Sequence, residues 1–103
     1  MINLSKIASV KEYEIMYIVK PVDNDVYEAV IKKYDDLINN NNGDVVKTER
    51  WGKKRLAYEI QDFCEGLYVL TTFAATPACV KELDRVMRID DNVLRHMIIS
   101  KGW

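Results

Sequence analysis

The stretch YEIMYIVK at residues 13–20 is the strongest structural signal in the chain, and Pro21 follows it directly. Tyrosine, isoleucine and valine favour a packed strand. Successive side chains of a strand point to opposite faces, so Ile15 and Met16 place apolar surface on both sides. A strand that is apolar on both faces lies inside a sheet. Residues 12–20 are therefore predicted to form an interior strand.

The next segment changes to the spacing of a helix. Apolar residues recur at intervals of three and four over residues 27–38, which predicts a helix that buries one face. Asp25 and Glu28 suit its first turn because carboxylates satisfy free N–H groups and complement the helix dipole. Asparagines at 39–42 and then Gly43 tolerate the left-handed conformation that ends a helix.

The rest of the chain gives three more strands and a second helix. Gly52 lies within a long strand pattern and predicts a bulge there rather than a strand end. Thr76 followed by Pro77 predicts a helix start, since a hydroxyl caps the helix and proline suits its first position. In order, the predicted segments are a strand at Asp44–Ile60, a polar connection at 61–65, a strand at 66–75, a helix broken at 90–92, and a strand at Val93–Ser100.

The element order βαββαβ predicts an α+β domain of the ferredoxin-like class. Right-handed crossovers in its two βαβ halves place both helices on one face of a four-stranded antiparallel sheet. The other face, called the open face below, must then meet solvent or a partner. We expect one domain over residues 11–103, preceded by a flexible leader at residues 1–10, which hold one lysine and no long apolar run.

Composition argues against several classes of protein. The net charge is −1, from 15 basic and 16 acidic residues, so the overall charge does not indicate nucleic acid. Cys64, Cys79 and His96 are too few to build a structural zinc site or an iron–sulfur cluster. We expect no metal, no cofactor and two reduced thiols in a cytosol-like compartment. Nothing approaches the roughly 20 apolar residues that span a bilayer.

Candidate catalytic residues are few. The sequence has no GxxxxGK[ST], GxGxxG or GxSxG motif, so phosphate-loop, dinucleotide and hydrolase chemistry lack their local geometry. His96 has no evident orienting partner as a base for a cysteine, and we expect it to pack where sheet and helix meet. The carboxylate pairs at 35–36 and 90–91 are interpreted as solvent-facing charges rather than acid–base groups.

The location of positive charge is more informative than its total. Between Lys47 and Arg55 there are five basic residues and one acidic residue, with Trp51 and Tyr58 adding flat aromatic surfaces. Cations beside exposed rings suit phosphate neutralisation and base stacking in looped RNA. A solvated edge strand guarded by lysines gives the same pattern, so the run alone leaves both interpretations open. A second basic group comprises Arg85, Arg88, Arg95 and Lys101.

Five segments occur in register between residues 11 and 101: YEIMYIV at 13–19 with Pro21, WGKKRLAY at 51–58, EGLY at 65–68, ELDR at 82–85 and DNVLRHM at 91–97. Together they resemble the bacterial small-subunit ribosomal protein six family. The resemblance implies a ferredoxin-like protein of the 30S subunit. It implies binding to the central domain of 16S rRNA as a heterodimer with small-subunit ribosomal protein eighteen. It also implies a location on the ribosome, in a bacterial or organellar cytoplasm, and neither an enzymatic activity nor a small-molecule substrate.

The resemblance also carries over individual residues. Alternation along the last strand places Arg95 on the open face. Trp51 and Tyr68 are expected on the surface that meets the protein partner. Glu59 stands where many family members have proline, which leaves the assignment unchanged. The residues implied to contact rRNA are Tyr13, Lys53, Lys54, Arg55, Arg95 and Lys101.

Two other functions are compatible with the predicted fold. A regulatory module that senses a small molecule and dimerises through its sheet would explain an apolar open face, but not the basic run from Lys47 to Arg55. An acylphosphatase-like enzyme would need a glycine-rich phosphate loop between the first strand and the first helix. The sequence has no such loop.

Overall fold

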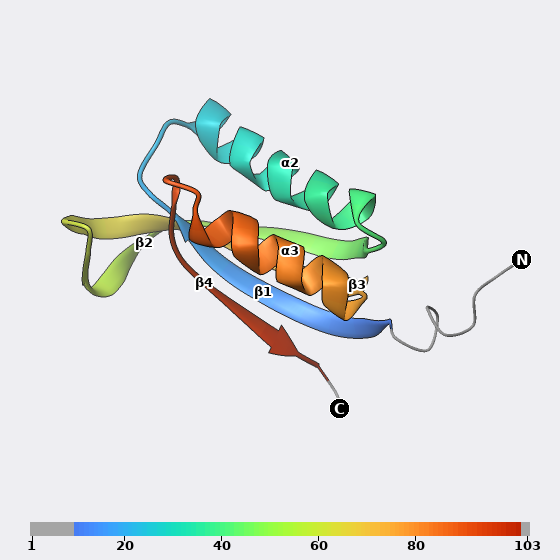
Figure 1. Ribbon diagram of the computed structural model, residues 1–103. Coiled ribbons are helices and arrows are strands. Elements are labelled where there is room, and N and C mark those ends of the chain that lie inside the picture. Colours follow the sequence, from blue (N-terminus) through green and yellow to red (C-terminus); the bar gives the residue numbers. More distant parts are fainter. Residues whose placement is uncertain (1–9, 102–103) are drawn as a thin grey trace, which may run out of the picture.

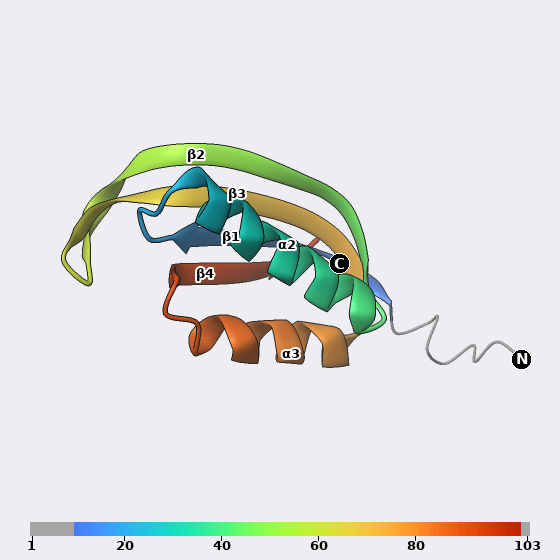
Figure 2. The same cartoon turned by 90° about the horizontal axis from the view of Figure 1, so that it is seen from above.

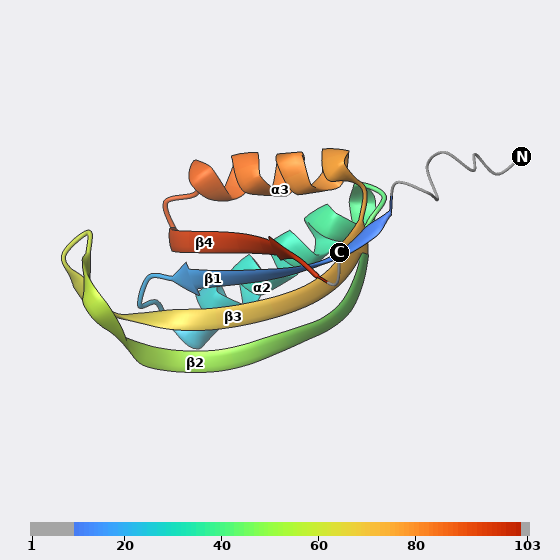
Figure 3. The same cartoon turned by 90° about the horizontal axis from the view of Figure 1, so that it is seen from below.

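The computed structural model describes residues 10–101, so the predicted leader lies outside the described residues except for Val10. The sheet order is β2-β3-β1-β4, with every neighbouring pair antiparallel. Both helices cover one face (Figure 1), and the view from below shows the strands in front of α2, with α3 along the β4 edge (Figure 3). The predicted ferredoxin-like βαββαβ fold is confirmed. The elements are β1 (Lys11–Val19), α2 (Asn24–Asn40), β2 (Asp44–Ile60), β3 (Phe63–Ala75), α3 (Pro77–Arg88) and β4 (Val93–Ser100).

Strand β1 is the interior strand that its sequence predicts. It lies between β3 and β4, and Ile15 and Tyr17 are completely buried beneath the helices. Met16 and Ile18 alternate with them onto the open face. Helix α2 packs over β2 and β3, whereas α3 lies along β4 (Figure 2). The main core therefore fills the space between the helices and the face of the sheet that they cover.

One predicted boundary is wrong, and one helix cap comes from a residue that the prediction did not name. The polar connection at 61–65 is only a two-residue turn, because Gln61 and Asp62 both adopt positive φ and join β2 directly to β3. Polar side chains are compatible with strand in a solvent-exposed hairpin, so polarity there misled the prediction. Asp25 lies in the first turn of α2 as predicted, but the cap is Asp23, whose carboxylate accepts a hydrogen bond of 3.0 Å from the backbone N–H of Val26. The predicted cap of α3 at Thr76 is confirmed.

The two carboxylate pairs are not uniformly solvent-facing, so that interpretation is wrong for one member of each. Asp35 accepts hydrogen bonds of 3.1 and 3.2 Å from the Thr48 hydroxyl of β2. The side chain of Asp90 is 7% exposed and accepts hydrogen bonds from the Tyr34 hydroxyl and from Lys33 at 3.1 Å. Both carboxylates thus fasten α2 to its neighbours.

The open face has a small apolar cluster of its own, made by Ile18, Leu56 and Gly66. Ile18 and Leu56 are each 8% exposed and belong to β1 and β2. Between them in β3, a Cβ atom on Gly66 would lie 2.3 Å from the Cγ2 atom of Ile18 and 3.6 Å from a Leu56 methyl. The absence of a side chain at Gly66 therefore lets Ile18 pack directly on the backbone of β3.

Replacing Gly66 with alanine is expected to lower the free energy of unfolding by about 1–3 kcal/mol, because an added methyl overpacks a filled site. Urea denaturation of Gly66→Ala, Ile18→Ala and the double variant measures this. The double variant should lose less stability than the two single losses added together, since Ile18→Ala removes the clashing methyl. Strict additivity would show that Ile18 does not pack on Gly66.

Candidate nucleic-acid interface

Large apolar side chains remain exposed on the open face. Met97 and Ile99 of β4 are 52% and 48% exposed and pair in register with Met16 and Glu14 of β1, which point away from the helices. Trp51 and Tyr58 of β2 are 43% and 61% exposed. Several large exposed apolar side chains on one face mark an interaction site more often than a single exposed residue does.

The far end of the β2–β3 hairpin bends toward the open face, away from the helices (Figure 1). Leu56 and Tyr58 follow Lys54 at intervals of two and therefore share its side of β2. The guanidinium of Arg95 donates a hydrogen bond to the Tyr58 hydroxyl and lies 6.0 Å from the centre of the Tyr58 ring. This contact joins the two edge strands, β2 and β4, across the open face.

A hollow of about 310 Å³ lies on the open face beside this contact. Its floor is apolar, whereas the Arg95 side chain supplies positive charge at its border. Such a surface suits a flat ring or an apolar side chain with an anionic group nearby. The hollow is lined by Met16, Ile18, Tyr68, Arg95, His96 and Met97.

The predicted basic run on β2 is divided between two faces. Lys53 pairs with Leu67 and Arg55 with Glu65, whereas Lys54 pairs with Gly66 of the open-face cluster. Cross-strand partners share a face, so Lys54 points to the open face and Lys53 and Arg55 point to the other. The Lys54 ammonium lies 5.8 Å from the centre of the Trp51 ring.

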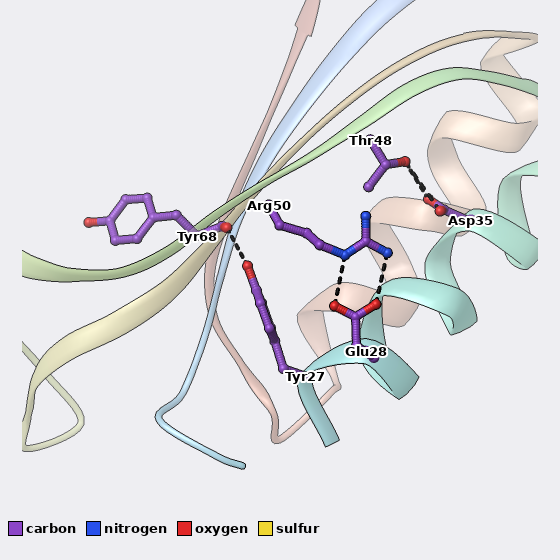
Figure 4. A network of polar contacts seen from close by, with 6 residues as sticks. All are labelled: Tyr27, Glu28, Asp35, Thr48, Arg50 and Tyr68. Carbon is purple, nitrogen blue, oxygen red and sulfur yellow. Dashed lines mark hydrogen bonds and ion pairs between the residues drawn. The ribbon is translucent and has the colours of Figure 1, made fainter. Parts of the chain in front are cut away.

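The basic residues also differ in their ion pairs. Arg50 forms two hydrogen bonds with Glu28 of α2, of 2.7 and 2.8 Å, on the helix side of the sheet (Figure 4). Lys101 lies 3.6 Å from a carboxylate oxygen of Glu12 and 3.8 Å from one of Glu14. Exposed pairs are weak, so Lys101 can exchange its carboxylates for phosphate. Over residues 10–101, the basic residues of the predicted site without a carboxylate partner are Lys53, Lys54, Arg55 and Arg95.

The three aromatic residues of the predicted site have different surroundings. Tyr13 is 8% exposed and stacks on Phe73 at 5.7 Å on the helix side, so it does not lie on the open face. Tyr68 is half-buried on the open face, and Figure 4 shows its ring pointing away from Tyr27. Trp51 is the most accessible of the three.

The predicted set also omits Tyr58 and Met97, which alternation with Lys54 and Arg95 would have placed on the open face.

The remaining polar candidates have structural surroundings. His96 packs between sheet and helix as predicted, with its Nε2 atom 2.7 Å from a carboxylate oxygen of Asp84 in α3. This hydrogen bond lowers the pKa of Asp84.

Cys64 is exposed, Cys79 is buried, and both are free thiols. Within residues 10–101 there is no group of three side chains arranged to hold a metal, and no helix there is long and apolar enough to cross a membrane.

Comparison with known proteins decides the family. The family model described as ribosomal protein S6 matches residues 12–100. The chain belongs to the ribosomal protein S6 family. Small ribosomal subunit protein bS6 of Desulforamulus reducens is 47% identical over 93 residues, which cover 89% of this chain and 98% of that protein. The corresponding protein of Desulforudis audaxviator is 46% identical over 92 residues, or 88% of this chain and 98% of its own length.

Solved structures agree with this family. The 30S ribosomal protein S6 of Thermotoga maritima superimposes with a TM-score of 0.85 at 28% identity, over 89% of this chain and 88% of that one. The C-terminal domain of the MgtC protein from Mycobacterium tuberculosis, at 13% identity and a TM-score of 0.58, shares the fold alone.

Membership of the ribosomal protein S6 family settles the class of function. The chain is a structural constituent of the small ribosomal subunit, associates there with rRNA, and is not an enzyme. As a bacterial-type small-subunit protein it is located on the ribosomes of the cytoplasm. This assignment replaces both the regulatory-module and the acylphosphatase-like alternatives.

Proposed function

We propose that this chain binds the central domain of 16S rRNA together with small-subunit ribosomal protein eighteen, through the open face and the β2–β3 hairpin. The observation that carries the proposal is the exposed apolar surface of the open face, bordered by two cations that have no carboxylate partner among residues 10–101. Lys54 lies at the β2 border and Arg95 at the β4 border. Apolar surface suits a protein partner, whereas the cations suit phosphate.

The two kinds of contact have separate places on this surface. Trp51 and Tyr68 offer aromatic surface to the protein partner, in the part of the sheet where β2 pairs with β3. Tyr13 offers RNA only the 8% of its surface that is accessible, so we assign it the smallest contribution to RNA binding. We assign the contacts with phosphate to the basic residues Lys53, Lys54, Arg55, Arg95 and Lys101.

The low charge of the chain explains why the partner is needed. Phosphate neutralisation supplies most of the salt-dependent affinity for RNA, and attraction over longer distances depends on net charge. With a net charge of −1, this chain attracts RNA weakly by itself. A basic partner on the apolar surface adds the missing positive charge next to Lys54 and Arg95.

Binding of the purified protein to a 16S central-domain RNA fragment, with and without small-subunit ribosomal protein eighteen, tests the proposal. Tight binding only in the presence of the partner is the expected result. A filter-binding titration at several salt concentrations gives the affinity and its salt dependence. Equal binding with and without the partner contradicts the heterodimer, and no binding in either mixture contradicts the whole proposal.

A further inference from the structure

A network of polar contacts fastens the N-terminal half of α2 to β2 and β3 on the helix side of the sheet. Arg50 of β2 forms its two-pronged ion pair with Glu28 of α2 (Figure 4). The hydroxyl of Tyr27, the preceding residue of α2, donates a hydrogen bond of 2.7 Å to the backbone carbonyl of Tyr68 in β3. Residues on one helix turn thus hold two neighbouring strands.

These contacts surround a β-bulge. Arg50 pairs with Val69 and Gly52 pairs with Tyr68, so Trp51 is the extra residue between two consecutive partners. Gly52 has φ of +75°, a left-handed conformation that glycine adopts without strain. Burial raises the pKa of the Tyr27 hydroxyl, and the backbone amide of Gly52 opposes this rise.

The bulge determines which lysine accompanies Trp51. Regular alternation after Arg50 would place residues 51 and 53 together on the open face and residues 52 and 54 on the helix side. The extra residue shifts this pattern, so that Trp51 and Lys54 lie together, with the ammonium 5.8 Å from the ring centre, and Lys53 points away. A bulge re-aims side chains in this manner.

We infer that Glu28 and Arg50 are positioning residues for the open-face interface, because their ion pair anchors the bulge that presents Trp51 and Lys54. Arg50 therefore differs in role from the other cations of the basic run and is not an RNA ligand. This inference rests on the proposed function for its binding consequence, but not for its effect on Trp51 in the free protein.

The geometry distinguishes this pair from an ordinary surface ion pair. Two parallel hydrogen bonds fix the orientation of the guanidinium as well as its distance, and the pair joins a helix to an edge strand. It lowers the pKa of Glu28 and raises that of Arg50. Lys32 and Asp36 form a matched control, since their 2.8 Å pair is exposed and lies entirely within α2.

The test uses the full chain with Trp103 replaced by phenylalanine, so that fluorescence reports Trp51 alone. Glu28→Gln should increase acrylamide quenching of Trp51 in the free protein. It should also weaken the complex with partner and rRNA by about three- to tenfold, which lies within the range expected for a residue that acts without touching the ligand. The exchanged pair Glu28→Arg with Arg50→Glu should recover both values, and Asp36→Asn should change neither.

Two results would overturn the inference. One is unchanged quenching of Trp51 in Glu28→Gln, whatever happens to binding, because the pair then does not hold the bulge. The other is equal weakening of binding by Asp36→Asn, which would indicate loss of a helix charge pair in general. If the parent chain binds neither partner nor RNA, the proposed function fails, while the quenching of Trp51 still decides the positioning role.

Discussion

Replacing Lys54 and Arg95 with glutamate in one chain is expected to weaken the complex with partner and rRNA by about 100-fold. A hydrogen bond to a charged group contributes about 1.5 kcal/mol or more, and about 1.4 kcal/mol corresponds to a factor of ten. Both side chains border the apolar open face, and neither has a carboxylate partner within the described part of the chain. The slope of log affinity against log salt concentration should become shallower by about 0.7–0.9 for each phosphate that is no longer neutralised.

Two matched variants, each with two charge reversals, distinguish the effect of position from the effect of net charge. Lys32→Glu with Lys81→Glu changes the formal charge equally but lies on the two helices, and it should assemble like the parent. Lys53→Glu with Arg55→Glu lies on the opposite side of the hairpin and measures the RNA contacts made there. Equal weakening by the helix pair would contradict a localised site. Unaltered assembly of the Lys54 and Arg95 variant at every salt concentration would exclude the open face.

Asp90→Asn is expected to lower the free energy of unfolding at neutral pH by about 2–3 kcal/mol. The carboxylate is nearly buried and accepts hydrogen bonds from the Tyr34 hydroxyl, from Lys33 and, at 2.8 Å, from the backbone N–H of Asn92. An asparagine amide turns a donor toward the first two, and a buried donor without an acceptor costs about 1–3 kcal/mol. Asp91→Asn, at the exposed neighbouring position, is the control and should change stability little.

The same carboxylate predicts a pH dependence of definite sign. Burial raises the pKa of Asp90, but the hydrogen bonds of Tyr34, Asn92 and Lys33 outweigh it, so the folded-state pKa is lowered. A lowered pKa stabilises the fold above the unfolded value, about 3.9, and this contribution disappears as pH falls through the folded-state value. The stability difference between parent and Asp90→Asn should therefore shrink below about pH 4. A constant difference from pH 7 to pH 2 in urea denaturation would contradict this account.

Much of the fold is predictable from local sequence because each element obeys a single periodicity. The central position of β1 follows from apolar residues on both of its faces. The helices α2 and α3 follow from apolar residues that recur every three or four positions and are buried on one side of each helix. The turn at Gln61 and Asp62 does not follow, since neither residue type requires positive φ. Burial of Asp90 depends on Tyr34, which lies far away in sequence, so no local pattern could reveal it.

The candidate interface was predictable as a region but not as an arrangement. The residue types between Lys47 and Arg55 were compatible with RNA contact and with a solvated edge strand, and alternation correctly placed Arg95 on the open face. Gly52 indicated a bulge, yet its effect depends on the register with β3, which puts Lys54 on the open face beside Trp51 and leaves Lys53 opposite. The Arg95–Tyr58 contact joins the two edge strands, which are far apart in the sequence, so no short segment specifies it.

The position of β1 between β3 and β4 has a consequence for synthesis of the chain. Translation completes β1 before either of its partner strands exists, and β3 can cover one edge well before β4 is made. Until then the other edge, where Met16 later pairs with Met97, exposes unpaired backbone beside apolar side chains. Such edges promote association between incomplete chains. We therefore expect nascent chains that end before Val93 to engage chaperones, and completion of β4 to release them.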